Sequence, residues 1–214
     1  MSADAQTEGH DHHGPAEYTY HPYPIRLGAT PLGLVVFLVS EIGLFGGFFL
    51  WYGHDRLLNN QRGWPWPTGF DLPANSTSIN TAILIASSFT CEMAMIGLFR
   101  KSRPMLQWWL VATLLLGATF LGLQAREYHD LGVTPKTNAQ TSIFFSLTGL
   151  HGAHVFLGLT LLLMCIIRAF RGHFSPEKGK YTGLLVTSIY WHFVDIVWIV
   201  LYTLVYLTPT HVPS

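Results

Sequence analysis

The stretch SIFFSLTGLHGAHVFLGLTLLLMCII, residues 142–167, contains no aspartate, glutamate, lysine or arginine. A helix needs about 20 mostly apolar residues to cross the hydrocarbon core of a bilayer, which is about 30 Å thick. The stretch therefore predicts a membrane-spanning helix. It also carries two histidines, His151 and His154, which an apolar segment does not need in order to enter a membrane.

The composition of the whole chain is typical of a membrane protein. Half of the 214 residues are hydrophobic and 11% are charged, whereas soluble domains average about 25% charged residues. Five segments are long and apolar enough to span: about 31–52, 79–99, 105–125, 141–167 and 184–207. They are too long and too apolar for barrel strands. We therefore predict an all-α, polytopic membrane bundle of five transmembrane helices, without a nucleic-acid partner.

Two regions of unequal character make up the chain. Residues 28–208 hold the five spans and form the predicted transmembrane domain. Residues 1–27 are mostly polar, and their composition predicts a disordered tail rather than a metal site, although histidines lie at positions 10, 12, 13 and 21. The tail lacks the basic stretch followed by an apolar stretch that marks a cleavable signal peptide.

Lysine and arginine residues are distributed unequally between the two sides of the predicted bundle. Eight of the 12 lie on the side of the N-terminus: Arg26, Arg100, Lys101, Arg103, Arg168, Arg171, Lys178 and Lys180. The opposite side carries Arg56, Arg62, Arg126 and Lys136. Because cytoplasmic loops are enriched in these residues, we expect a cytoplasmic N-terminus and an external C-terminus.

Six ionisable side chains lie within the predicted spans, where each costs roughly 2.5–3.5 kcal/mol to insert. They are Glu41, Glu92, His151, His154, His192 and Asp195. Residues three apart share a helix face, so each pair at that spacing should point one way, into the bundle. We interpret the six as an internal polar network that fixes helix packing. A proton path or ion-coupled site through the same residues stays open as an alternative.

A metal centre is a further alternative for these residues. Di-iron bundles use Glu-x-x-His repeats on their helices, and no predicted span contains that order. Cys91 and Cys165 lie on different spans and are expected to be buried apolar side chains. We therefore predict no metal site and no catalytic residue on this chain.

Glu41 lies about ten residues into the first span, which places it about 15 Å deep at a rise of 1.5 Å per residue. An unpaired anion is least tolerable at that depth. We therefore expect the Glu41 carboxyl to be protonated or paired with an imidazole. Small residues let helix backbones approach closely in membranes, and we expect such contacts at Gly43, Gly46, Gly47, Gly149, Gly152 and Gly158.

Four segments of the chain form a distinctive set: FLVSEIGLFGGFFLWY (37–52), LGLQAREYHD (121–130), FFSLTGLHGAHVFLG (144–158) and YWHFVDIVWIVLYTLVYL (190–207). They resemble subunit III of the haem–copper terminal oxidases. The stretch WPWPTGFDLPANSTSINTAILIASS (64–88) resembles the Trp-Pro-rich external loop of that family and the helix that follows it. The resemblance runs in the family's order from about residue 28 to residue 207.

The resemblance implies an accessory, non-redox subunit of an aerobic respiratory oxidase, and a cytochrome c oxidase in particular. Such a complex reduces O2 to water and pumps protons. Its haems and copper would lie in partner subunits, so this chain would bind no redox cofactor itself. The implied partners are subunits I and II, a small subunit IV, phospholipids, and cytochrome c or quinol as electron donor. This chain would brace subunit I and support proton uptake and oxygen access.

Longer members of the family have seven helices, and this chain resembles the last five, as in shorter bacterial members of the inner membrane. In longer members the first two helices form one arm of a cleft that holds phospholipid. The stretch RAFRGHF resembles a basic segment that contacts lipid headgroups, and it matches at Arg168, Arg171 and His173. Ordinary positive-inside charge is the alternative interpretation. Glu41 matches a family carboxylate proposed to lie near an oxygen route into subunit I.

Other functions remain open at this point. The chain could accompany a quinol oxidase or a nitric oxide reductase instead of a cytochrome c oxidase. A function of another class would be an ion-coupled transporter that uses Glu41, His151 and Asp195. Transporters often contain internal repeats and interrupted helices, and this chain has no apparent repeat and no proline inside a predicted span.

Overall fold

A computed structural model describes residues 29–60, 74–132, 134–137, 139–175 and 180–207. Five long helices account for most of these residues: α1 (Ala29–Asn60), α2 (Ala74–Phe99), α3 (Arg103–Asp130), α4 (Ala139–Phe170) and α5 (Thr182–Tyr202). A short π-helix, η2 (Thr203–Leu207), follows α5 directly. The predicted tail and residues 64–73 of the Trp-Pro stretch lie outside the described residues.

All five helices are long and apolar enough to cross a membrane. Their spanning segments are Leu32–His54, Ser76–Phe99, Arg103–Asp130, Thr141–Phe170 and Thr182–Leu207. In hydrocarbon the main-chain polar groups have no water to bind, and a helix satisfies them within its own segment. The prediction of an all-α bundle with five transmembrane helices is confirmed.

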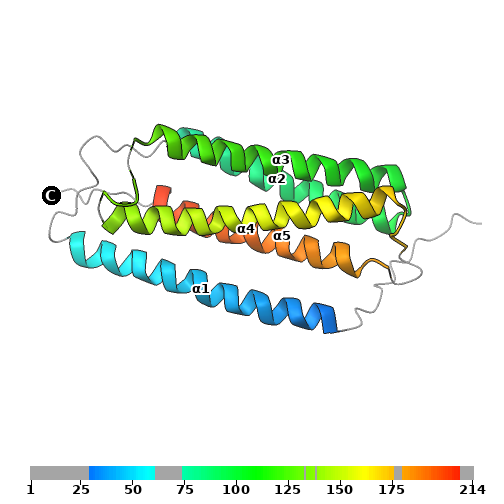
Figure 1. Cartoon of the computed structure of the whole chain (residues 1–214), viewed down its shortest axis with the longest axis horizontal. Helices are drawn as coiled ribbons and strands as arrows, with labels where there is room; N and C mark the ends of the chain where they lie inside the picture. Colours follow the sequence, from blue (N-terminus) through cyan, green and yellow to red (C-terminus); the bar gives the residue numbers. More distant parts are fainter. Residues whose placement is uncertain (1–28, 61–73, 133, 138, 176–179, 208–214) are drawn as a thin grey trace, which may run out of the picture.

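The helices run roughly along one common axis, with α1 along one flank of the others (Figure 1). α1 packs against α4 and α5. α2 and α3 form a tight hairpin, whose turn holds Lys101 at a positive φ of 58°. A Cβ atom added at Gly97 would lie 2.9 Å from the backbone nitrogen of Leu106, so glycine permits the close approach of the two helices here.

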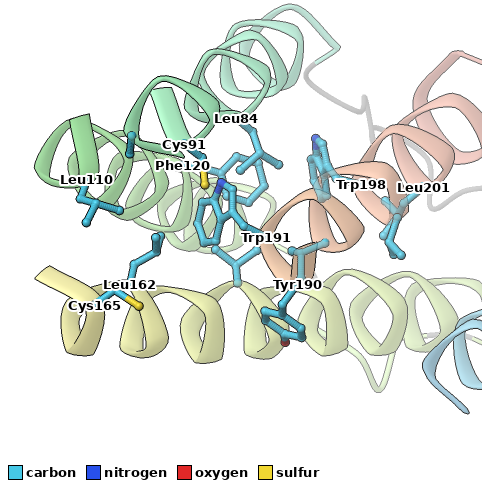
Figure 2. Packing of buried hydrophobic residues seen from close by; sticks show 14 of the residues in the cluster. Leu84, Cys91, Leu110, Phe120, Leu162, Cys165, Tyr190, Trp191, Trp198 and Leu201 are labelled. Carbon is cyan, nitrogen blue, oxygen red and sulfur yellow. The ribbon is translucent and has the colours of Figure 1, made fainter. Parts of the chain in front are cut away.

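Trp191 of α5 lies at the centre of the bundle, fully buried among apolar side chains (Figure 2). Its ring packs against the backbone of α3 at Gly117 and of α4 at Gly158, where an added Cβ would come within 2.6 and 2.8 Å of ring atoms. Its Nε1–H donates to the Ser87 hydroxyl of α2 at 3.0 Å. One side chain of α5 therefore contacts α2, α3 and α4.

The glycines predicted to mark close helix contacts behave differently from one another. Gly158 meets Trp191, as expected, and Gly152 has ordinary contact with Leu121 at 3.7 Å. At four positions the prediction is wrong among the described residues, because a Cβ added at Gly43, Gly46, Gly47 or Gly149 would meet no atom of another helix within 4 Å. These glycines of α1 thus do not serve its contact with α4 and α5.

Gly158→Ala should destabilise the bundle, because the new methyl group would overlap the Trp191 ring. Overpacking of this kind costs about 1–3 kcal/mol. Gly149→Ala on the same helix is the matched control, since its Cβ would enter open space. Thermal unfolding in detergent, followed by tryptophan fluorescence, checks the difference. Equal midpoints for the two variants would contradict the role assigned to Gly158.

Candidate functional site

Glu41 of α1 and His154 of α4 form a polar contact between two helices. Glu41 Oε2 lies 2.9 Å from His154 Nε2, and the two side chains are 13% and 12% exposed. The other ring nitrogen, Nδ1, lies 2.8 Å from the backbone oxygen of Leu150. A carbonyl oxygen only accepts hydrogen bonds, so Nδ1 carries a proton and donates it.

This geometry limits how protons distribute between the two groups. With Nδ1 protonated, Nε2 either accepts from a neutral Glu41 carboxyl or, as an imidazolium, donates to a carboxylate. Both arrangements hold the same number of protons, and both leave the pair with no net charge. The pair therefore meets the constraint that membrane hydrocarbon places on Glu41.

Aromatic side chains surround His154. The Phe45 ring of α1 meets the imidazole edge-on at a centroid distance of 5.1 Å. The Tyr190 hydroxyl of α5 donates to the backbone oxygen of His154 at 3.1 Å. Residues of α1 thus contact the His154 imidazole, and α5 contacts the backbone of the same residue.

His151 does not share this environment, although it lies three residues from His154. Its ring is 1% exposed. It packs against Phe120 of α3 and Trp198 of α5 at centroid distances of 6.0 and 4.9 Å. Neither ring nitrogen has a hydrogen-bond partner among the described residues. The expectation that this histidine pair points one way is corrected, because the two rings contact different helices.

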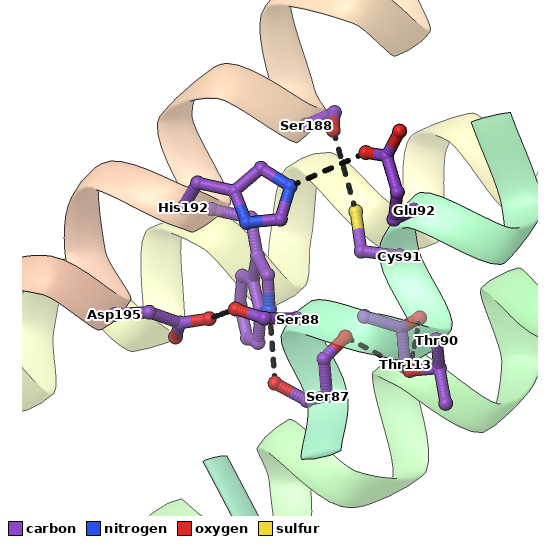
Figure 3. A network of polar contacts seen from close by, with 10 residues as sticks. Ser87, Ser88, Thr90, Cys91, Glu92, Thr113, Ser188, His192 and Asp195 are labelled. Carbon is purple, nitrogen blue, oxygen red and sulfur yellow. Dashed lines mark hydrogen bonds and ion pairs between the residues drawn. The ribbon is translucent and has the colours of Figure 1, made fainter. Parts of the chain in front are cut away.

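The second pair, His192 and Asp195 of α5, faces α2 (Figure 3). His192 Nε2 lies 3.7 Å from Glu92 Oε2, and these side chains are 37% and 59% exposed. Asp195 is buried and accepts a hydrogen bond from the Ser88 hydroxyl. Sequence-predicted residues therefore meet in two separate contacts, Glu41 with His154 and Glu92 with His192.

Several polar contacts along the α2–α5 interface were not predicted from the sequence. The indole N–H groups of Trp191 and Trp198 donate to Ser87 and Thr81, each at 3.0 Å. Nearer the turn between α2 and α3, the Cys91 thiol donates to the Ser188 hydroxyl at 3.6 Å. The sequence does carry a signal for these contacts, because serine and threonine recur in the second predicted span. The sequence analysis considered only the apolar length of that span.

Glu127 is a further functional candidate that the sequence reasoning missed. It is 8% exposed, and Oε1 accepts hydrogen bonds from Thr77 of α2 and Tyr206 of η2, both at 3.0 Å. The sequence placed the end of the third span before this residue, whereas α3 continues to Asp130. The longer helix brings the carboxyl between two other elements.

The predicted lipid-binding residues lie at the end of α4. Arg168, Arg171 and His173 are exposed. The Arg168 guanidinium lies 5.7 Å from the centroid of the Phe174 ring. Gly172 has a positive φ of 68°, the left-handed conformation in which glycine avoids steric strain. The chain turns here and leaves cationic groups at the helix end, where a phosphate could approach.

Cysteine, histidine and carboxylate side chains do not gather into a metal-binding group in the described part of the chain, since no three of them come together. Cys91 and Cys165 are buried and free. The arrangement thus favours contacts between helices over ligation of a metal.

Comparisons with known proteins give one consistent result. The family model "Cytochrome c oxidase subunit III" matches residues 14–209. The chain is 42% identical over 177 residues to cytochrome c oxidase subunit 3 of Thermostichus vulcanus, covering 82% of this chain and 86% of the relative. It is 40% identical over 184 residues to a probable cytochrome c oxidase subunit 3 of Mycobacterium leprae, covering 85% and 89%. The rabbit (Oryctolagus cuniculus) subunit 3 is 37% identical over 192 residues, covering 87% and 72%.

Glu41→Gln should preserve the contact with His154, because a glutamine amide can donate to Nε2 while Nδ1 still donates to Leu150. Glu41→Leu should leave Nε2 without a partner and lower the free energy of unfolding by about 0.6–1.7 kcal/mol, the range for interhelical hydrogen bonds in membranes. Unfolding in mixed micelles measures both. Equal stability of the Leu variant and the unmodified chain would show that the pair does not hold α1.

Proposed function

This chain belongs to the cytochrome c oxidase subunit III family, and we propose that it acts as an accessory, non-redox subunit of a respiratory haem–copper oxidase. The observation that carries the proposal is the family match over residues 14–209, which includes all five helices. The chain is thus part of an oxidoreductase complex whose redox chemistry takes place on other subunits.

The donor set of this chain supports a role without a redox centre. Histidines bind haem iron or copper through a ring nitrogen, but His154 uses both ring nitrogens in contacts to Glu41 and Leu150. Among the described residues, no three side chains of histidine, cysteine, aspartate or glutamate come together in any combination. These residues do not fit a metal centre, and the haems and copper are assigned to partner subunits.

Bracing of subunit I is the proposed contribution of the bundle. Trp191 contacts three other helices, and the Glu41–His154 pair joins α1 to α4. A rigid bundle of this kind can hold a neighbouring subunit in one conformation. Because the Glu41–His154 pair has no net charge, it places no ionic barrier beside an apolar path for O2. Support for proton uptake would come from Glu92 and His192, whose side chains are partly exposed on the surface of this chain.

The orientation in the membrane is proposed from the cationic groups. The chain is a multi-pass membrane protein. The α2–α3 turn and the C-terminal end of α4 lie at the same end of the bundle (Figure 1). Lys101 and Arg103 of the α2–α3 turn line one pocket with Phe174, which follows α4. We assign this basic end to the cytoplasm of a bacterial cell, with the N-terminus inside and the C-terminus outside.

A phospholipid headgroup is the proposed ligand of Arg168, Arg171 and His173. Their exposed side chains lie at the cytoplasmic end of α4 in this orientation. Cationic groups at a membrane surface attract phosphate groups. The proposed partners of the complex are subunits I and II and a small subunit IV, and the proposed electron donor is cytochrome c, in keeping with the names of the relatives.

An affinity tag on this chain should co-purify haem from native membranes under mild detergent. The optical spectrum should show reduced haem bands, and their type distinguishes a cytochrome c oxidase from a quinol oxidase or a nitric oxide reductase. After the partner subunits are stripped, metal analysis should find no stoichiometric iron or copper on this chain. A tagged complex without haem would contradict the proposal and favour an ion-coupled transporter.

Asp195→Leu should reduce the amount of this chain per haem in the purified complex, because the Ser88 hydroxyl would lose its acceptor inside the bundle. Asp195→Asn keeps an acceptor oxygen and is the matched control. We expect a partial loss for Leu, in line with about 0.6–1.7 kcal/mol per interhelical hydrogen bond, and near-normal assembly for Asn. Quantitative gel analysis against haem absorbance decides, and normal assembly of the Leu variant would count against a structural role for Asp195.

A further inference from the structure

Besides Asp195, whose Oδ1 is unpartnered, three buried polar side chains of the described bundle have hydrogen-bonding atoms without partners. The atoms are Asn80 Oδ1, Gln124 Nε2 and Oε1, and both ring nitrogens of His151, and none has a partner among the residues that the structure describes. The three side chains are 2%, 3% and 1% exposed. An unmet buried polar atom costs about 1–3 kcal/mol, and native proteins satisfy such atoms with protein groups or ordered water.

Asn80 and Gln124 lie opposite each other in the antiparallel pair α2–α3. At one end of this stretch Thr77 donates to Glu127 at 3.0 Å. One turn further along α2, Asn80 Nδ2 donates to the backbone oxygen of Phe120 at 3.3 Å. Gln124 lies between Phe120 and Glu127 on α3, so it occupies the level of Asn80.

His151 lies at the same level on α4. The Phe120 ring meets the His151 ring at a centroid distance of 6.0 Å. The Tyr128 hydroxyl donates to Thr148 at 2.6 Å. Gln124 is one turn from both Phe120 and Tyr128 on the same face of α3. The Gln124 amide therefore lies between the Phe120–His151 and Tyr128–Thr148 contacts, and it faces the segment of α4 between Thr148 and His151.

The neighbouring donors are already engaged in other hydrogen bonds. Trp198 packs 4.9 Å from His151, but its indole N–H donates to Thr81 at 3.0 Å. The Tyr128 hydroxyl donates to Thr148, and its oxygen is within reach of the Gln124 amide N–H as an acceptor. The Tyr206 hydroxyl donates to Glu127 at 3.0 Å. Tyr128 can accept only from Gln124 Nε2, so Asn80 Oδ1, Gln124 Oε1 and both His151 ring nitrogens still have no partner among the described residues.

A direct hydrogen bond between Gln124 and His151 would not solve the problem, because Asn80 Oδ1 would remain unmet. A water molecule donates two hydrogen bonds and accepts two. It could accept a hydrogen bond from the Gln124 amide or the His151 ring N–H and donate one to Asn80 Oδ1 at the same time. Buried waters in proteins typically make about three such bonds.

We propose that the bundle binds ordered water between Asn80, Gln124 and His151. The site is built from one side chain each of α2, α3 and α4, and Trp198 of α5 closes one side. Water satisfies a neutral imidazole, which needs one donor and one acceptor, so the site requires no charge in the membrane. The Thr77–Glu127–Tyr206 contact, one turn away, separates the site from the nearer end of the bundle.

A high-resolution cryo-EM map of the purified membrane assembly that contains this chain tests the proposal. We expect a water peak at about 2.7–3.2 Å from Asn80 Oδ1 and from at least one polar atom of Gln124 or His151. The proposal is overturned if other buried waters of the assembly are resolved and this position is empty. A direct Gln124–His151 bond without a water peak also overturns it.

Infrared spectroscopy of variants gives a second test, which does not depend on the redox role of the complex. The wild-type assembly should show an O–H stretching band of buried water that shifts in H2-18O. Gln124→Met should lose or displace this band. Gln107→Met on the same helix is the matched control, because its amide donates to Ala169 and not to this site. If the Gln124→Met assembly is intact and its O–H stretching band is unchanged from that of the wild type, the proposal is overturned.

Discussion

Polar groups inside a hydrocarbon layer have no water to bind, and this constraint governs the structure of the chain. The main chain meets it by forming five long helices. The side chains meet it by pairing across helices: Glu41 with His154, Asp195 with Ser88, and Glu127 with Thr77 and Tyr206. Each pairing fixes the register of two or more helices, so the same contacts that remove the cost of burial also determine how the bundle packs.

The chain holds its helices together in two different ways. Around Trp191, close packing against Gly117 and Gly158 joins α5 to α3 and α4, and glycine is required because any Cβ would enter the ring. Along the flank, α1 is attached through Glu41 and Phe45, which contact His154, and through apolar side chains such as Leu38 and Phe48 that pack against the core. A Cβ added at a glycine of α1 would meet no described residue of another helix within 4 Å. Both helices combine hydrogen bonds with apolar packing, but only α5 places a large ring against glycine backbone.

This organisation suits a subunit that supports chemistry without performing it. The ionisable groups of the spans are paired with one another, as Glu41 is with His154, or buried, as His151 is, and the described residues offer no cluster of metal ligands. Most of the described basic groups lie at one end, where Lys101 and Arg103 share a pocket with Phe174. The proposed roles in bracing a catalytic neighbour and binding anionic lipid rest on these two features, the paired interior and the cationic end.

The sequence by itself determined the fold class, because a run such as residues 142–167 is too long and too apolar to be anything but a spanning helix. It also identified Glu41 and the histidines as residues that need partners, and the resemblance of five segments pointed to the family. Only the tertiary structure decided which partner each one has. His151 and His154 lie only three residues apart, yet the His151 ring contacts α3 and α5, whereas the His154 ring contacts α1. The predicted third span ended before Glu127, whereas α3 in the structure extends beyond this residue to Asp130. The physical reason is that apolar length is a local property of the chain, whereas a hydrogen bond between helices depends on their rotation and register, which packing around side chains such as Trp191 sets.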